Sequence, residues 1–113
     1  MMAAELMATV TLHNLGPLER IPLGEGRTFK VGDEEVAVFR ARNGKVYGAQ
    51  ARCPHRGGPL ADGLLGGSKV LCPLHGYAFD LESGAALRNS CEALRTFLVE
   101  VTAEGEIVLA MPD

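Results

Sequence analysis

The chain has 113 residues and a formal net charge of −3; 47% of the residues are hydrophobic and 22% are charged. This length favours one domain with a modest core and excludes two. The acidic balance argues against nucleic acid and anionic membrane surfaces as partners. Fourteen glycines and six prolines predict many turns between short strands.

The N-terminal third predicts an edge strand followed by a loop. Residues 10–13 alternate weakly between apolar and polar side chains, which is typical of an edge strand. Residues 15–22 contain Gly16, Pro17 and Pro22, so we expect a loop there. Residues 1–10 carry neither the basic segment nor the apolar run of a signal peptide, and no stretch is apolar enough to span a membrane. We therefore expect a soluble, cytoplasmic protein.

Two turns predict three consecutive antiparallel strands in the middle of the chain. Residues 27–31 and 35–40 are rich in Val and Phe, and Gly32-Asp33 between them indicates a two-residue hairpin. Asn43-Gly44 predicts a type I′ turn that joins residues 36–42 to residues 45–50.

The second half predicts further short strands and no helix. The expected elements are a glycine-bounded turn at 63–67, strands at 69–72 and 77–80, a turn at 82–84, a loop at 85–93, and a closing hairpin of 95–101 and 106–109 around Glu104-Gly105. The fold class predicted from these elements is all-β.

Two short loops carry paired metal-ligand residues. The first is Cys53-Pro54-His55 and the second is Cys72-Pro73-Leu74-His75, with sixteen residues, 56–71, between them. Zinc fingers usually place like ligands together, as Cys-x(2–4)-Cys and His-x(3–5)-His. Here each loop supplies one thiol and one imidazole, which favours a [2Fe–2S] cluster with both thiolates on one iron and both imidazoles on the other. Zinc bound by the same four residues, or a site without metal, are the alternatives.

At these residues the sequence resembles the Rieske iron–sulfur family. Cys53, His55, Cys72 and His75 occupy the four ligand positions of that family. The runs 52–63 and 72–81 further resemble the small subunit of assimilatory NAD(P)H nitrite reductase, although stand-alone Rieske ferredoxins of oxygenase systems share much of the pattern. The resemblance covers about residues 10–109.

The resemblance implies a small antiparallel β-sandwich of the Rieske type. A single domain would span residues 8–110, and its cluster-binding subdomain, made of the two ligand loops, about residues 51–80. It also implies one [2Fe–2S] cluster per chain and a role in electron transfer. No catalytic residues are expected, because the sequence contains no Ser/His/Asp array, paired carboxylates or phosphate loop.

Three functions follow from this resemblance and its alternatives. The first is the small subunit of a cytoplasmic NAD(P)H nitrite reductase in nitrate assimilation, whose large subunit would hold FAD and sirohaem. The second is a free ferredoxin that passes electrons from a flavoprotein reductase to an oxygenase. The third is a non-redox structural module that binds zinc or no metal.

The resemblance also indicates a low reduction potential. High-potential Rieske proteins carry a disulfide between their loops, and the corresponding positions here are Gly58 and Leu74. The Ser and Tyr that donate hydrogen bonds to cluster sulfurs in those proteins correspond to Tyr77 and Phe79. With fewer donors, we expect a potential at the low end of the Rieske range, about −150 mV.

Several other residues have simpler interpretations. We expect His13 to lie on the surface. Cys91 is expected to be a small buried apolar side chain, with a reactive thiol as the alternative. Asp80 is expected at a turn or strand end, with tuning of the site as the alternative. Arg56 fits either a solvated charge or a contact with a partner's carboxylate. Leu60, Leu64 and Leu65 fit either an apolar docking rim or a core.

Overall fold

The computed structural model describes residues 10–54, 57–74, 76–87 and 91–112. Within these residues the fold consists of β-strands and two short 3-10 helices, so the all-β prediction is confirmed. The strands are β1 (Val10–Pro17), β2 (Glu25–Val31), β3 (Glu34–Arg40), β4 (Val46–Gln50), β5 (Leu64–Gly66), β6 (Lys69–Leu71), β7 (Ala78–Asp80), β8 (Thr96–Val101) and β9 (Glu106–Pro112). The 3-10 helices are η1 (Leu18–Arg20) and η2 (Leu60–Asp62).

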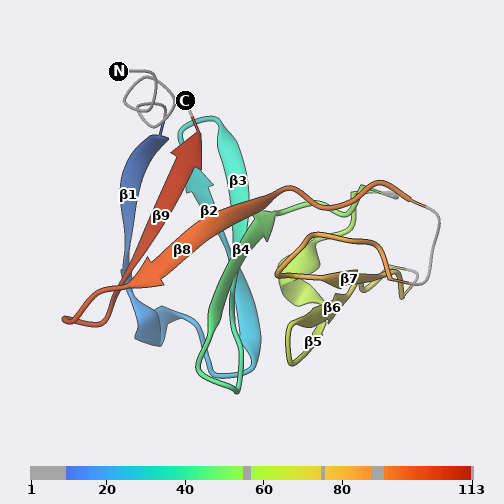
Figure 1. Cartoon of the computed structure of the whole chain (residues 1–113), viewed down its shortest axis with the longest axis horizontal. Coiled ribbons are helices and arrows are strands. Elements are labelled where there is room, and N and C mark those ends of the chain that lie inside the picture. Colours follow the sequence, from blue (N-terminus) through green and yellow to red (C-terminus); the bar gives the residue numbers. More distant parts are fainter. Residues whose placement is uncertain (1–9, 55–56, 75, 88–90, 113) are drawn as a thin grey trace.

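The larger sheet has six antiparallel strands in the order β1-β9-β8-β4-β3-β2. Strands β4 and β8 share only two residue pairs, Gly48 with Phe97 and Ala49 with Thr96. This short junction lets the sheet bend into two three-stranded halves, which enclose one hydrophobic core (Figure 1). The first and last strands pair along their length, with Val10 opposite Pro112, so the described chain enters and leaves the sandwich at the same place.

Strand β3 is buried on both of its faces. Val36 and Val38 point into the core between the two halves of the large sheet. Ala37 and Phe39, the alternate residues, belong to a second core against the smaller sheet. The two-sided burial explains why residues 36–39 are continuously apolar rather than alternating.

The smaller sheet, β5-β6-β7, is inserted between the neighbouring strands β4 and β8 (Figure 1). Its central cross-strand row of Leu65, Val70 and Phe79 packs into the second core. Two hydrogen bonds close the base of the insertion. The Gln50 N–H donates to the Arg95 carbonyl at 2.9 Å, and the Arg95 N–H donates to the Gln50 side-chain oxygen at 2.8 Å.

The turn at Asn43-Gly44 differs from the predicted type I′ turn. No described residue other than glycine has a positive φ, so Asn43 does not adopt the left-handed conformation that this turn requires. Instead the Gly44 N–H donates to the Ala41 carbonyl at 3.0 Å, and Gly44 alone is left-handed, with φ +92°. The Asn43 side chain accepts a hydrogen bond from the Lys45 N–H at 2.8 Å, which holds the longer loop. The Gly32-Asp33 hairpin is confirmed by the pairing of Val31 with Glu34.

Two predicted loops contain regular structure. The first strand runs to Pro17 across an irregularity at Gly16, whose N–H donates to the Asn14 side chain at 2.8 Å. The glycine-bounded turn at 63–67 contains strand β5, because Leu64 and Leu65 pair with β6 and only Gly67-Ser68 forms the turn. The closing hairpin is confirmed by β8 and β9. Of the loop predicted at 85–93, residues 88–90 lie outside the described residues, and Ala86 forms an isolated bridge with Phe79.

Candidate metal centre

The structure places the two cysteines of the predicted ligand set at the ends of strands. Cys53 follows β4 after two intervening residues, and Cys72 directly follows β6. The exposed fractions of these residues are 2% and 3%, and both pack in the core that β3 shares with the smaller sheet. Neither cysteine forms a disulfide. The two thiols are therefore held in one buried environment.

The two loops have the same backbone frame. In the first, the Gly57 N–H donates to the Cys53 carbonyl at 2.7 Å, and the Cys53 N–H donates to the Gly58 carbonyl at 2.8 Å. In the second, the Gly76 N–H donates to the Cys72 carbonyl at 3.0 Å, and the Cys72 N–H donates to the Tyr77 carbonyl at 2.7 Å.

A glycine is required at the fifth position of each frame. Gly57 has φ +73° and Gly76 has φ +70°, a conformation that side chains rarely adopt. The sequence then places a histidine inside each frame, two residues after Cys53 and three residues after Cys72.

The loops touch each other at Gly58. A Cβ added to this glycine would lie 2.8 Å from Sγ of Cys72 and 3.0 Å from Cγ of Leu74. The absence of a side chain thus allows the first loop to approach the thiol of the second. The positions of Gly58 and Leu74, where the resemblance would place a disulfide, face each other across the two loops.

The described half of the donor set fits an iron–sulfur cluster. Two buried thiols supply soft sulfur ligands, and no polar or charged side chain among the described residues is buried beside them. His55 and His75 lie outside the described residues. Consequently the described residues contain no group of three or more possible His, Cys, Asp or Glu ligands. The imidazole half of the site remains a prediction from the sequence.

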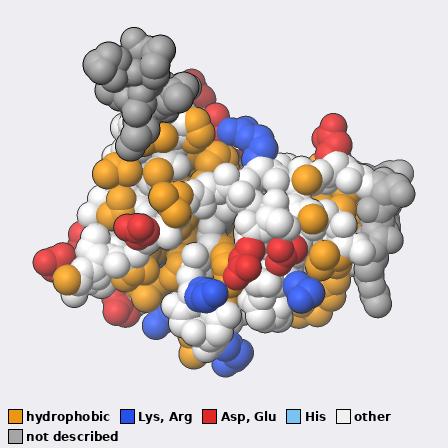
Figure 2. All heavy atoms as spheres, viewed as in Figure 1, with side chains coloured by type: hydrophobic (Ala, Val, Ile, Leu, Met, Phe, Trp, Pro, Cys, Tyr) orange, Lys and Arg blue, Asp and Glu red, His pale blue; other side chains and the backbone are white. Residues whose placement is uncertain are grey.

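The three leucines near the first loop have different environments. Leu60 is fully buried and Leu65 packs partly against the core, whereas Leu64 is 73% exposed. The docking-rim interpretation therefore fits Leu64 only. Leu71 and Leu74, beside and within the second loop, are also exposed. Figure 2 shows apolar side chains exposed on both the sandwich and the inserted sheet.

The remaining predicted residues lie as follows. Phe79 is fully buried and has no hydroxyl to offer, and Tyr77 is half-buried against the same core. His13 is on β1, at the far edge of the large sheet. Cys91 is half-buried against the core, and its thiol donates to the Glu92 carbonyl at 3.4 Å. Arg56 lies outside the described residues.

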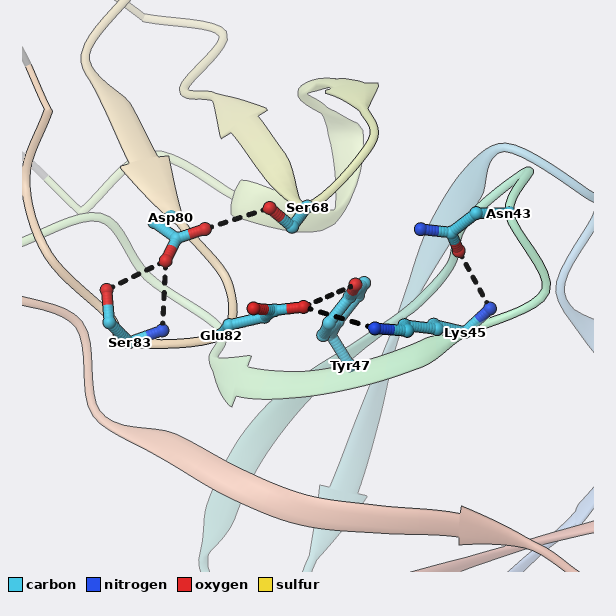
Figure 3. Close-up of polar contacts among 7 residues, drawn as sticks. All are labelled: Asn43, Lys45, Tyr47, Ser68, Asp80, Glu82 and Ser83. Carbon is cyan, nitrogen blue, oxygen red and sulfur yellow. Dashed lines mark hydrogen bonds and ion pairs between the residues drawn. The ribbon is translucent and has the colours of Figure 1, made fainter.

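Asp80 is the last residue of β7, so its expected place at a strand end is confirmed, but the sequence did not predict all the polar contacts of Asp80 and Glu82. Asp80 Oδ1 accepts a hydrogen bond from the Ser68 hydroxyl at 2.9 Å, and Oδ2 accepts from the Ser83 hydroxyl at 2.8 Å and its N–H at 3.2 Å (Figure 3). Glu82 Oε2 lies 3.3 Å from the Tyr47 hydroxyl and 3.5 Å from Nζ of Lys45. The Asp-x-x-Ser spacing indicates the turn contact of Asp80, but nothing in the sequence indicates its bond to Ser68.

The pKa of Asp80 is below its ordinary value of 3.8. The hydrogen bond from the Ser83 side chain is the largest cause. Burial raises the pKa to a smaller extent, and hydrogen bonds from Ser68 and from the N–H groups of Ser83 and Glu82 lower it further. The Asp80 carboxylate is therefore charged at neutral pH.

A comparison with family models decides the family. The model of the Rieske [2Fe-2S] domain matches residues 12–98. The chain belongs to the Rieske [2Fe–2S] family. Its cofactor is a [2Fe–2S] cluster, and it is an electron-transfer protein of the Rieske type. Within the described residues of this Rieske domain, no helix has the length and apolar character needed to cross a membrane.

Two relatives of this Rieske domain belong to different systems. The ferredoxin component of the naphthalene 1,2-dioxygenase/salicylate 5-hydroxylase systems of a Ralstonia species is 36% identical over 70 residues, which are 62% of this chain and 66% of the relative. The nitrite reductase [NAD(P)H] of Emericella nidulans is 33% identical over 100 residues, 80% of this chain and 9% of the enzyme. The chain thus spans less than two thirds of both.

Two solved structures are similar over nearly the whole chain. The proposed small subunit of an NADH-dependent nitrite reductase from Mycobacterium tuberculosis has a TM-score of 0.84 at 24% identity, covering 92% of this chain and 97% of that one. The ferredoxin of carbazole 1,9a-dioxygenase from Nocardioides aromaticivorans has a TM-score of 0.79 at 30% identity, covering 91% and 99%. The first likeness shows the fold alone.

Proposed function

We propose that Cys53 and Cys72 bind one iron of the cluster, and that His55 and His75 bind the other, within a single domain of residues 8–110. The burial of both thiols in two matching frames supports the cysteine half of this assignment. The cluster, when bound, accepts and returns one electron.

The chain's own residues would hold and shield the cluster. The left-handed glycines turn each loop back on itself, which leaves the cysteine carbonyl bonded within the loop. Leu60 and Phe79, both fully buried, exclude water from the protein side of the thiols. Leu64, Leu71 and Leu74 are exposed nearby and give this end of the molecule an apolar surface for a partner protein.

The assignment can be tested by metal and sulfide analysis together with EPR of the reduced, anaerobically purified protein. Two irons and two sulfides per chain, with the spectrum of a mixed Cys/His cluster, are expected for the wild type. Cys53→Ala, His55→Ala, Cys72→Ala and His75→Ala should each abolish the cluster.

The chain offers matched controls, because Cys91 and His13 are the remaining cysteine and histidine. Cys91→Ala and His13→Ala should retain full iron content. Loss of iron in either control, or its retention in a ligand variant, would contradict the ligand set. Zinc instead of iron, or no metal, would favour a structural module.

We propose that the partner is the large subunit of a cytoplasmic NAD(P)H nitrite reductase, and that this chain is its small subunit in nitrate assimilation. The 33% identity to the Emericella nitrite reductase, over 80% of this chain, supports this role. The large subunit would hold FAD and sirohaem.

A free ferredoxin of an oxygenase system is the second candidate. It is favoured by the identities to the Ralstonia and Nocardioides ferredoxins, 36% and 30%. Stoichiometric co-purification with a large sirohaem protein would support the nitrite reductase subunit. Rapid reduction by a small flavoprotein reductase, with no stable complex, would support the ferredoxin instead.

A further inference from the structure

The second ligand loop is the tip of a very short hairpin. Strands β6 and β7 have three residues each, and they pair Lys69 with Asp80, Val70 with Phe79 and Leu71 with Ala78. The Cys72 N–H to Tyr77 carbonyl bond adds one further link at the tip. An isolated hairpin of this length is not stable in water, so its geometry depends on contacts at its base.

The two strands of this hairpin are not equally supported. Strand β6 lies between β5 and β7, so Cys72 is held through a central strand. Strand β7 is at the edge of the smaller sheet, where residues 85–87 run beside it without forming a strand. They make one β-bridge, Phe79 with Ala86, and a hydrogen bond from the Leu87 N–H to the Ala78 carbonyl at 2.9 Å. The return path of the loop, through Tyr77 into β7, therefore has the weaker anchor.

The Asp80 carboxylate joins the two strands at the base of the hairpin (Figure 3). It accepts from Ser68, the residue just before β6, and from Ser83, in the turn after β7. Next to it, the Leu81 N–H donates to the Ser68 carbonyl at 2.6 Å. We call the three side chains Ser68, Asp80 and Ser83 the carboxylate bridge.

The carboxylate bridge also fixes the chain that returns beside β7. The Ser83 hydroxyl, which donates to Asp80, accepts from the Ala85 N–H at 3.1 Å. The backbone of Asp80 donates to the Ala85 carbonyl at 2.9 Å and accepts from the Gly84 N–H at 2.7 Å. These bonds place Ala86 where its backbone pairs with Phe79. The carboxylate bridge therefore supports β7 on both sides.

We propose that Asp80 is a positioning residue for the cluster: through the carboxylate bridge it keeps β7 paired with β6 and so holds the second ligand loop in its binding geometry. This inference rests on the proposed ligation of the cluster by Cys72 and His75. Opening the bridge frees β7, and with it the loop, while the sandwich strands stay paired. The cluster then leaves by local opening of the hairpin rather than by global unfolding.

The test compares the rate at which the oxidised, cluster-loaded protein loses iron to an excess of chelator. Asp80→Asn removes the charge and one acceptor, and Ser83→Ala removes one donor. Ser83→Thr keeps the hydroxyl and serves as the conservative rescue. Glu82→Gln is the matched control, because it changes only a side chain in the same turn that contacts Tyr47 and Lys45; the Glu82 N–H that bonds Asp80 is kept. Global unfolding rates are measured on the same samples.

We expect Asp80→Asn to release iron about four times faster than wild type, and Ser83→Ala about three times faster. Ser83→Thr and Glu82→Gln should release iron at the wild-type rate. Each increase should exceed the change in the global unfolding rate.

Three results would overturn the inference: wild-type release from Asp80→Asn, equal release from Ser83→Ala and Ser83→Thr, or release that changes only in step with global unfolding. If Asp80→Asn does not fold, the two Ser83 variants decide. Wild-type protein without iron would instead refute the ligand set.

Discussion

The contact between the two ligand loops predicts a specific effect of Gly58→Ala. The new Cβ would lie 2.8 Å from Sγ of Cys72, whereas ordinary van der Waals contact begins at 3.4 Å. The sulfur or the first loop must therefore move by about 0.6 Å. A free thiol can do so by rotating, but a thiolate bound to iron is held to within about 0.2 Å, so the loop must move instead. Gly58 does not have a positive φ, and the backbone itself accepts alanine.

The expected effect is selective for the cluster-loaded protein. Overpacking of this kind costs about 1–3 kcal/mol, which corresponds to iron release about 5 to 150 times faster than from wild type. The metal-free protein should unfold in urea within about 0.5 kcal/mol of wild type.

The matched control is Gly66→Ala, where an added Cβ meets nothing within 4 Å and φ is not positive. It should leave both the iron release rate and the stability unchanged. Wild-type iron release from Gly58→Ala would show that the loops are not in this contact once the cluster is bound.

Three further predictions use stability and redox measurements. Gly63→Ala should lower the free energy of unfolding by about 2–3 kcal/mol, because its Cβ would overlap the backbone carbonyl of Leu71. Gly66→Ala, three residues along the chain, is the control, and equal urea midpoints for the two variants would contradict the reasoning. Because the pKa of Asp80 is lowered in the folded protein, the carboxylate stabilises the fold above about pH 4, and this stabilisation is lost as the pH falls through the lowered pKa. In urea titrations, the difference in free energy of unfolding between wild type and Asp80→Asn is under about 1 kcal/mol for this half-exposed group and should therefore shrink towards about pH 2. A difference that grows as the pH falls would contradict the lowered pKa. Finally, the buried Phe79 offers no hydroxyl, so voltammetry should give a potential near −150 mV, and a value well above zero would refute the argument from missing donors.

The sequence predicts most strands, because side-chain periodicity and turn residues are local signals. The hairpin at Gly32-Asp33 and the closing hairpin are of this kind. The type I′ turn predicted at Asn43-Gly44 was wrong, because the same two residues also fit a longer hairpin loop. The hydrogen bond from Lys45 to the Asn43 side chain favours the longer loop.

Strand β5 could not be predicted, because its three residues lie between glycines that are typical of turns. It is a strand because β6 supplies its hydrogen-bond partners, and such pairing is tertiary. The metal centre shows the same limit. The spacing predicts the ligand set, but the contact of Gly58 with Cys72 and the bond from Ser68 to Asp80 join residues 14 and 12 positions apart, which no local pattern indicates.

The pairing of Val10 with Pro112 has a practical consequence for the two ends of the domain. Both ends lie on the sandwich, while both cysteine loops belong to the part of the chain inserted between β4 and β8 (Figure 1). A tag, a surface tether or a second protein can therefore be attached at one end or both without crossing the loops. The same geometry allows the whole domain to be spliced into a longer polypeptide as a side branch, with its redox end pointing away from the junction.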